Sequence, residues 1–334
     1  MLASRPIAGA LAVLFGGFAS ACAQDFYQGK SINIVVGYTS GGGFDANARL
    51  LARYIGRYIP GNPDVVVSNM PGAASLTSVL YLDSAAPKDG TVMNVFNFGE
   101  VGNARMGVSH VKIDFRKFQW IGSTSRDITV CYLWHALGMK TLEDAKRSGR
   151  KLHFSLTALG TSNDVNQRIL KNILGLDLQQ VNGYPGSAEE KLAIERGEID
   201  GNCGSWASTP IDWLTGAKVN TITRSGPAPA GMSPSVPFIV DISPEKDREI
   251  VHFFATATEV LRPFIVSAAV PAERVKILRD AFDKSVKDPD FLAEAVRQRI
   301  PASPLNAQQT AAMVNEIYAT PDSIVDSARK IAGE

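Results

Sequence analysis

The chain has 334 residues, which is enough for two domains of ordinary size. Its 34 basic and 33 acidic side chains leave a formal charge of +1, so there is no basic field to hold a nucleic-acid backbone, and no nucleic-acid partner is expected. Hydrophobic residues make up 45% of the chain and charged residues 20%, the proportions of a folded protein and not of a disordered one.

Residues 1–23 have the pattern of a secretory signal peptide. Arg5 is their only charge, and an apolar stretch leads to a small-x-small cleavage site formed by Ala21 and Ala23. The Gly and Ala content disfavours a membrane anchor, which needs about 20 predominantly apolar residues. We expect cleavage near Ala23 and export of a mature chain with a formal charge of zero, because the removed segment carries one Arg and no acid.

The three cysteines include no CxxC motif, which excludes a zinc ribbon, an iron–sulfur site and a disulfide-framework fold. Cys22 is either removed with the signal peptide or lipidated as the first residue of a lipoprotein, and the cleavage site favours removal. Cys131 and Cys203 are then the one pair that can form an intramolecular disulfide, which an oxidising compartment permits. Two separate buried thiols explain the sequence equally well.

The first part of the mature chain alternates strands with helices. Apolar, β-branched runs predict strands at residues 31–38, 65–68 and 91–96. Apolar residues at helical spacing predict a helix that ends at residue 59, and a second helix is expected at residues 75–83. This alternation describes a parallel α/β sheet.

A second α/β unit follows. Its expected elements are a strand at 128–134, a short helix capped by Thr141 and Asp144, a strand at 151–158, a helix at 162–174 ended by Gly175, a strand at 178–181, a helix at 188–196 closed by Gly197, and a strand at 199–203.

Pro and Gly cluster at residues 226–237, which predicts a loop or a crossing between domains. Beyond them we expect a helix at 244–257, an apolar strand at 264–270 and a helix opened by Pro271, followed by two or three more helices. If the late strand returns to the first sheet, the chain crosses between the domains twice and leaves a cleft between them.

Two Gly-containing turns stand between a strand and a helix, at residues 39–45 and 159–163. Gly lets the backbone turn tightly and approach a ligand, and the first turn of a helix offers free N–H groups and the positive end of its dipole. One such turn is usually an ordinary connection with a helix cap. Two of them on an exported chain favour a cleft that binds a molecule with two acidic ends.

Signals for a cofactor, a metal or catalysis are weak. Gly41, Gly43 and Ala46 fit a dinucleotide fingerprint, but the next strand ends in Ser68 and Asn69 where an acid would hold the ribose, so no cofactor is expected. No GxSxG, HExxH or SxxK motif occurs, and the four histidines lack metal-ligand spacing. We expect no enzyme activity and no metal site, and an exported α/β hydrolase with a triad of distant residues stays the alternative.

Several segments together resemble the extracytoplasmic solute receptors of tripartite tricarboxylate transporters, the Bug family. They are GYTSGGGFDANARLLARYI (37–55), NMPGAAS (69–75), APKDGTVM (86–93), GYPGSAEEKLAIERGEIDG (183–201) and VPAERVKILRDAFDKSVKDPDFLAEA (270–295). The resemblance covers essentially the whole mature chain. It implies an α/β, type II periplasmic binding protein fold, with two α/β lobes, a ligand cleft and two hinge crossings.

The resemblance also implies a role and a division of the chain. We expect a monomeric periplasmic receptor that closes on a small organic acid and delivers it to membrane permease subunits of a tripartite transporter. Lobe I is expected at residues 24–125 and about 238–334, and lobe II at about 126–237. A receptor that presents its ligand to a signalling partner would share this fold, and the sequence leaves both roles open.

The residues that match the family's ligand loops fall in both lobes. In lobe I they are Tyr38, Thr39, Ser40, Gly41, Gly42, Gly43, Phe44, Asp45, Pro71, Gly72, Ala73, Ala74 and Ser75. In lobe II they are Gly160, Thr161, Ser162, Asn163, Tyr184, Gly186, Gly204, Ser205 and Trp206. Trp206 has two readings of equal weight, a ring that stacks on the ligand and a ring that fills the core.

Two positions depart from the family's pattern. Ser40 stands where Pro is usual, and Phe44 stands where the pattern generally has a small hydroxyl residue that can bond the ligand. Phe44 removes a donor and adds an apolar face. A plain tricarboxylate such as citrate is therefore disfavoured, and a dicarboxylate, a longer-chain acid or an aromatic acid is favoured.

Overall fold

The computed structural model describes residues 26–107, 113–157, 159–184, 187–229, 231–298 and 300–332. The expected signal peptide with Cys22 and its cleavage site lies outside these ranges, and so does Gly186 of the expected ligand loops. Among the helices of these ranges, none combines the length and the apolar character that a membrane span requires.

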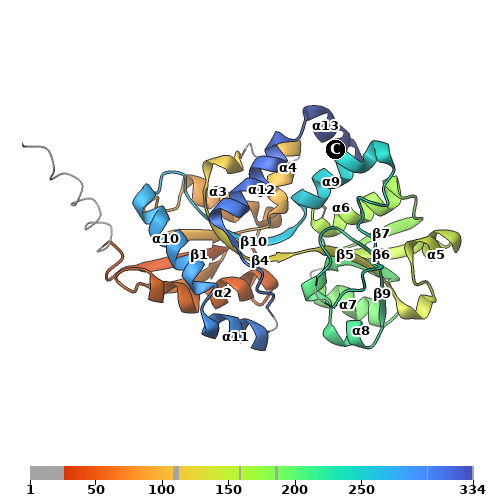
Figure 1. Ribbon diagram of the computed structural model, residues 1–334, viewed down its shortest axis with the longest axis horizontal. Coiled ribbons are helices and arrows are strands. Elements are labelled where there is room, and N and C mark those ends of the chain that lie inside the picture. Colours follow the sequence, from red (N-terminus) through yellow and green to blue (C-terminus); the bar gives the residue numbers. More distant parts are fainter. Residues whose placement is uncertain are drawn as a thin grey trace, which may run out of the picture.

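Two β-sheets lie at the centres of two lobes (Figure 1). The six-stranded sheet has the order β11-β4-β10-β3-β1-β2, and the five-stranded sheet has the order β7-β6-β8-β5-β9. The strands are β1 Ser31–Val36, β2 Asp64–Asn69, β3 Val92–Val95, β4 Gln119–Asp127, β5 Thr129–Trp134, β6 Leu152–Leu156, β7 Leu178–Asn182, β8 Gly201–Ser205, β9 Val219–Arg224, β10 Val260–Val266 and β11 Leu305–Asn306.

Helices cover both faces of the first sheet (Figure 1). One hydrophobic cluster joins one face to α2, α10 and α11, and another joins the opposite face to α3, α4, α9, α12 and α13. These helices are α2 Gly43–Ile55, α3 Leu76–Ser84, α4 Gly99–Met106, α9 Arg248–Ala257, α10 Ala272–Ser285, α11 Pro289–Arg297, α12 Ala307–Ala319 and α13 Asp322–Ala332.

Further helices accompany the second sheet. They are α5 Leu142–Arg147, α6 Ser162–Arg168, α7 Ser187–Glu195 and α8 Ile211–Thr215. The hydrophobic cluster that joins the first sheet to α3, α4, α9, α12 and α13 also continues into this lobe, where it includes Phe154 and Val165. Short 3-10 segments lie at Gly56–Tyr58, Ala73–Ser75, Phe115–Lys117, His135–Leu137, Trp206–Ser208 and Glu245–Asp247, and a π-helical segment at Ile169–Ile173.

The late strand returns to the first sheet, which is the condition stated above for two crossings between the lobes. The chain leaves the six-stranded sheet at the end of β4, enters the five-stranded sheet at β5, and comes back at β10, which lies between β3 and β4. The strand begins at Val260, four residues earlier than expected. The exact lobe boundaries near residues 126 and 237 stay a prediction.

The first sheet is parallel among the three strands expected at residues 31–38, 65–68 and 91–96, as predicted, and antiparallel elsewhere. β1 is parallel to β2 and β3, but β10 is antiparallel to β3 and β4. In the second sheet β5 is antiparallel to both of its neighbours. β5 directly follows the passage from the first sheet to the second, so it enters its sheet without the βα crossover that makes neighbours parallel.

The strand β4 was not expected because its sequence is polar. Its Ser and Thr side chains make specific bonds inside the fold: Ser123 Oγ donates to the carbonyl of Ser125 at 2.8 Å, and Thr124 Oγ1 donates to Asn47 Oδ1 at 2.9 Å. Those partners lie far along the chain or appear only in the folded strand. Hydrophobic periodicity therefore gives no signal for β4.

The helix ends that the local sequence predicted agree with the structure. Thr141 and Asp144 form the expected capping box of α5. Gly175 and Gly197 follow the helical segments with φ of +72° and +73°, a region that Gly enters without strain. Cys131 and Cys203 lie opposite each other on β5 and β8 and are joined by a disulfide, so the reading with two separate thiols is wrong.

Candidate ligand-binding site

In lobe I, three loops meet at one edge of the sheet because β2, β1 and β3 are parallel neighbours. Asn69 Nδ2 donates to the carbonyl of Tyr38 at 2.9 Å, which joins the end of β2 to the loop after β1. The N–H of Asn97 donates to Ser75 Oγ at 2.9 Å, which joins the loop after β3 to the Pro-Gly-Ala loop. The two expected ligand loops of lobe I are thus side by side.

The first Gly turn is exposed from Thr39 to Gly43. A Cβ atom added at Gly41 would meet nothing within 4 Å, and one added at Gly42 would meet the carbonyl oxygen of Thr39 at 3.9 Å. Gly42 has φ of −83° and ψ of 174°, which any residue adopts. The turn therefore leaves room for a ligand to approach the backbone.

Asp45 lies under this turn and is buried. Its carboxylate accepts from Gly41 N–H at 2.9 Å, from Arg49 Nε at 2.9 Å and from Asn69 Nδ2 at 3.0 Å. Burial raises the pKa of Asp45, but the hydrogen bonds from these three donors outweigh burial, and the pKa lies below its usual value. The structure gives the Asp45 side chain a clamping role in the turn.

The same arrangement recurs in lobe II. Residues 160–168 repeat the pattern Gly-x-x-x-Asp-x-Asn-x-Arg of residues 41–49. Asp164 accepts from Gly160 N–H at 2.8 Å, from Arg168 Nε at 2.8 Å and from Gln180 Nε2 at 2.8 Å. Gln180 lies on β7, which neighbours β6 as β2 neighbours β1. The two predicted anion turns are therefore built alike.

Thr161 caps α6, as its place before the helix suggested, by accepting from the N–H of Asp164 at 3.4 Å. The Asn of each repeat also makes the same bond. Asn47 donates to the carbonyl of Gly43 and Asn166 to that of Ser162, each at 2.8 Å.

An aromatic pair and a buried Arg support the first turn. The rings of Tyr38 and Phe44 stack with centroids 4.5 Å apart. The guanidinium of Arg262, from β10, lies 4.5 Å from the Phe44 ring centroid, and Arg262 is only 8% exposed. Phe44 thus contributes the apolar face that the sequence suggested, and part of it faces a cation.

Arg262 was not predicted from the sequence as a site residue. A single Arg inside an apolar strand was the available signal, because Arg is seldom buried without a specific role. Its guanidinium also lies close to the Gly43 backbone, where an added Cβ atom would be 3.2 Å from a terminal nitrogen.

The Pro-Gly-Ala loop has an unusual backbone. Gly72 has φ of 142°, and the next three residues, Ala73, Ala74 and Ser75, have φ of 44°, 51° and 83°. Residues other than Gly rarely adopt such values, which cost about 1 to 3 kcal/mol each. The Ser75 side chain, which bonds Asn97, helps to hold the loop in this form.

In lobe II, Asn163 and the end of β8 meet in a buried polar network around Glu190. Asn163 Nδ2 donates to Glu190 Oε1 at 3.3 Å, and Asn202 Nδ2 donates to Glu190 Oε2 at 3.2 Å. Gln167 Nε2 bonds the side-chain oxygens of both Asn residues. Burial raises the pKa of Glu190 to about 7, although hydrogen bonds from Asn202, Ser155 and Asn163 oppose the rise.

The remaining expected residues of lobe II lie at the ends of β7 and β8. Tyr184 and Trp206 are half-buried and pack against one small hydrophobic cluster that includes Trp213. Ser205 Oγ accepts from the N–H of Ser208 at 3.1 Å. Core packing and ligand stacking are both compatible with this place for Trp206.

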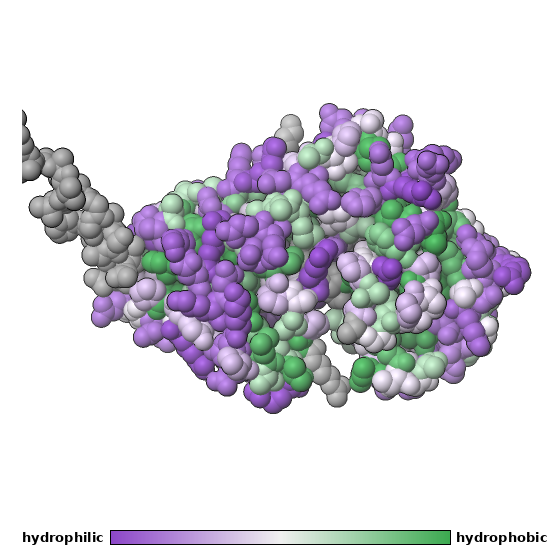
Figure 2. All heavy atoms as spheres, in the orientation of Figure 1, coloured by the Kyte–Doolittle hydropathy of each residue, from purple (hydrophilic) through white to green (hydrophobic). Residues whose placement is uncertain are grey.

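The second turn faces lobe I. An atom added at the Gly160 Cβ position would lie 3.4 Å from Asn103 Nδ2, on α4. Asn103 in turn donates to Glu100 Oε1 at 3.4 Å. Figure 2 shows a notch between the two lobes at the lower edge of the view.

Two observations bear on a hydrolase triad and on a metal site. His153 pairs with Asp200 at 3.5 Å, but it lies at the start of β6, whereas the Gly160 turn follows the end of that strand. Within the described ranges, no group of three or more His, Cys, Asp and Glu side chains is arranged to hold a metal.

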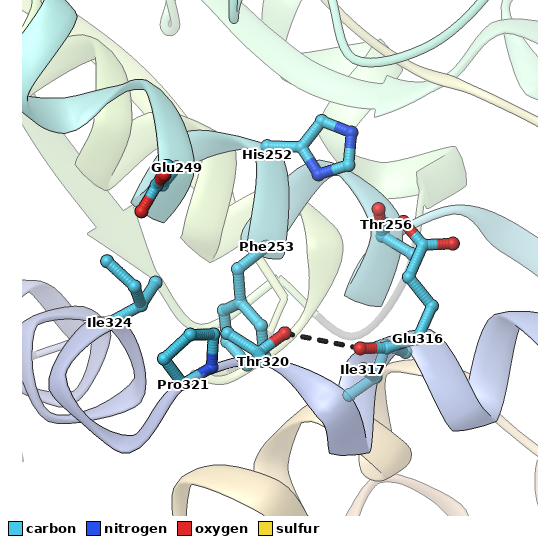
Figure 3. A pocket seen from close by; sticks show the side chains of 9 residues that line it. All are labelled: Glu249, His252, Phe253, Thr256, Glu316, Ile317, Thr320, Pro321 and Ile324. Carbon is cyan, nitrogen blue, oxygen red and sulfur yellow. Dashed lines mark hydrogen bonds between the residues drawn. The ribbon is translucent and has the colours of Figure 1, made fainter.

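A separate surface pocket of about 230 Å³ lies between α9 and the junction of α12 and α13 (Figure 3). None of the expected ligand residues lines it. Its lining comprises Glu249, His252, Phe253, Thr256, Glu316, Ile317, Thr320, Pro321 and Ile324.

Comparison with known proteins agrees with the resemblance seen in the sequence. No family model matches the chain. The chain is 23% identical over 345 aligned residues to the UPF0065 protein in the gbd 5' region of Cupriavidus necator, covering 97% of this chain and 96% of that protein. It is 24% identical over 271 residues to a UPF0065 protein of Agrobacterium vitis, covering 80% of this chain and 74% of that one.

Solved structures give the same result at the level of the fold. The periplasmic binding protein BugD has a TM-score of 0.67 at 18% identity, covering 92% of this chain and 99% of its own. A TctC solute-binding protein from Polaromonas also has a TM-score of 0.67 at 18% identity, covering 90% and 99%. The resemblance to the Bug family is confirmed. The fold is that of a two-lobed, type II periplasmic binding protein.

Two other similar solved structures contain a ligand. MatC from Rhodopseudomonas palustris, with bound malate, has a TM-score of 0.67 at 17% identity, covering 89% of this chain and 99% of its own. A second R. palustris protein, with adipate, has a TM-score of 0.68 at 19% identity, covering 91% and 98%.

Proposed function

We propose that this protein is a periplasmic receptor that captures a small organic carboxylate between its lobes and delivers it to a membrane transporter of the tripartite tricarboxylate type. The observation that carries the proposal is the matched pair of Gly turns. Each follows a parallel strand, opens a helix and is clamped by a buried Asp. Backbone N–H groups at helix N-termini suit a carboxylate without a net positive charge on the protein.

Ligand binding would close the lobes about the two crossings. Closure is favoured when the ligand contacts both turns only in the closed form, because its binding energy then differs between the two states. A dicarboxylate, a longer-chain acid or an aromatic acid fits the stacked Tyr38 and Phe44 rings better than citrate does, since these rings offer an apolar face beside the first turn.

The proposed compartment rests on the expected signal peptide and on the disulfide. A bond between Cys131 and Cys203 is stable in an oxidising compartment such as the bacterial periplasm. The ligands of MatC and of its R. palustris relative, malate and adipate, support an acid as the ligand class.

A thermal-shift screen of the mature protein tests this proposal. Dicarboxylates and aromatic carboxylates should raise the melting temperature, because a ligand that binds the native state stabilises it. A neutral sugar and a cation serve as controls. If one of these controls shifts the melting temperature and no carboxylate does, the proposed ligand class is wrong.

Gly42→Val is the matched variant for this screen. Its backbone accepts a side chain without strain, and the added Cβ atom has an open place, so the fold should be unchanged. The branched side chain should keep a ligand from the N–H groups of the turn and abolish the thermal shift. A variant that keeps the wild-type shift would move the site elsewhere.

A further inference from the structure

We propose that Glu100 determines ligand specificity in this cleft, and that the ligand is a carboxylic acid that also carries a hydrogen-bond donor, an amino or hydroxyl group, for the Glu100 side chain. This inference rests on the proposed function and names the substrate class of the same site. It starts from a buried acid that the carboxylate-binding turns do not explain.

Glu100 lies between the two Gly turns. It stands in the first turn of α4, directly after the loop that follows β3, at the sheet edge where the loops after β1 and β2 meet. Its charge acts on the hydroxyl of Tyr38, whose ring stacks on Phe44 of the first turn. On its other side Glu100 bonds Asn103, the residue that adjoins Gly160 of the second turn.

The protein provides little to balance a charge at this position. Glu100 is 4% exposed, and among the described residues its one side-chain partner is Asn103 Nδ2, at the long distance of 3.4 Å. Among the side chains that the structure describes, no Lys, Arg or His nitrogen lies within 4.0 Å of its carboxylate. Burial accordingly raises the pKa of Glu100 to about 7, although the bond from Asn103 opposes the rise.

Glu190 is a buried carboxyl group with a structural role, and its hydrogen-bond donors differ from those of Glu100. Both of its oxygens accept from Asn amides, and Gln167 holds those amides in place. Glu190 is therefore satisfied inside lobe II. Glu100 has no comparable set of donors, and it lies where the lobes meet, so a donor on the ligand would supply what the protein does not.

The charges around Glu100 predict how pH changes the preference between the two kinds of acid. Tyr38, Asn97 and Asn103 are neutral, and the Arg262 guanidinium, which lies against Phe44, contributes to the pKa of Tyr38 but not to that of Glu100. An ionised Glu100 repels a plain dicarboxylate and attracts an ammonium or hydroxyl group. Raising the pH through the Glu100 pKa should therefore favour the donor-bearing acid over the plain acid of equal length.

Titration calorimetry of the mature protein with matched acids tests the inference. The pairs are succinate with malate and aspartate, and adipate with 2-aminoadipate. Wild-type protein should prefer a donor-bearing member by about tenfold or more, the value of one hydrogen bond to a charged group. Glu100→Gln should remove most of this preference and strengthen the binding of the plain acid.

Asp283→Asn is the control, because it removes a carboxyl group whose pKa is also raised by burial, on α10, which carries none of the expected ligand residues, and it should leave the preference unchanged. If carboxylates bind the wild type but the preference is absent, or survives in Glu100→Gln, the inference is wrong while the proposed function stands. If no carboxylate binds the wild type, the proposed function itself fails.

A pH series with the wild type covers the case in which Glu100→Gln does not fold. Between about pH 6.5 and about pH 8.5 the carboxyl and ammonium groups of these ligands do not titrate appreciably, so a change in preference reports on the protein. The ratio of affinities, donor-bearing over plain, should rise with pH. A ratio that stays flat would overturn the inference.

Discussion

At the scale of single residues, the clamping Asp of each turn decides how the turn is built. A carboxylate in the first turn of a helix is expected to interact favourably with the positive end of the helix dipole. In this protein Asp45 and Asp164 do more, because each also accepts from the N–H of the Gly four residues earlier. The Arg four residues later balances the charge, so neither turn carries a net negative charge toward a ligand.

Asp45→Asn should therefore lower both the stability of the turn and the affinity for the ligand. The change replaces an acceptor oxygen with a donor next to Gly41 N–H and loses charge-assisted bonds, at a cost of about 2 to 3 kcal/mol in the free energy of unfolding. Urea unfolding and ligand titration would measure the two effects.

Arg49→Ala is the matched control for this clamp. The Arg49 side chain is 45% exposed, so its ion pair with Asp45 should be worth less than about 1 kcal/mol. A loss of ligand affinity in Arg49→Ala as large as in Asp45→Asn would show that the bond to Gly41 is not what holds the turn.

At the scale of elements, short-range signals predicted helix ends and several strands, whereas long-range pairing set the remaining strands. Thr141 and Asp144 cap α5 through bonds within four residues, so the sequence alone contains the whole motif. β4 depends on partners such as Asn47 and on its neighbour β10, more than 70 residues away. Its polar residues are acceptable only because those partners exist.

The disulfide between β5 and β8 is also an element-scale feature, since it closes a chain segment with a sequence separation of 72. By loop-closure entropy, replacing both cysteines with Ala should lower the free energy of unfolding by about 4 kcal/mol. Denaturant unfolding of oxidised wild type and of the double variant would measure the difference. A variant as stable as the oxidised wild type would contradict this prediction.

At the scale of the whole molecule, two buried carboxyl groups with raised pKa values make stability depend on pH. Glu100 and Glu190 each have a pKa of about 7 in the folded protein, above the usual Glu value of 4.5. The folded state therefore holds more protons than the unfolded state between these values. Stability from each group is complete below about pH 4.5 and is lost as the pH rises through about 7.

The free energy of unfolding should accordingly fall between about pH 5 and about pH 7.5, by on the order of 3 kcal/mol for each group. Glu190→Gln should flatten part of this slope. Unfolding by urea across this pH range would measure it for wild type and variant. An identical slope in the two proteins would mean that Glu190 is ionised in the folded state.

The sequence by itself determined the alternation of strands and helices, the two Gly turns and several helix caps, because hydrophobic period, Gly conformation and capping act over a few residues. The repeat of Gly, Asp, Asn and Arg in the two turns was also present in the sequence, but its meaning needed the bonds from Asn69 and Gln180 on neighbouring strands.

Only the tertiary structure decided the antiparallel strands, the disulfide and the places of Arg262, Glu100 and Glu190. Each depends on residues far apart in the chain: β10 inserts between β3 and β4, Cys131 lies opposite Cys203, and Glu100 lies between turns from different lobes. Burial sets the pKa of an acid, and burial is a property of the folded chain. A sequence pattern shows that a Glu is present, but not that it lies out of water without a cation beside it.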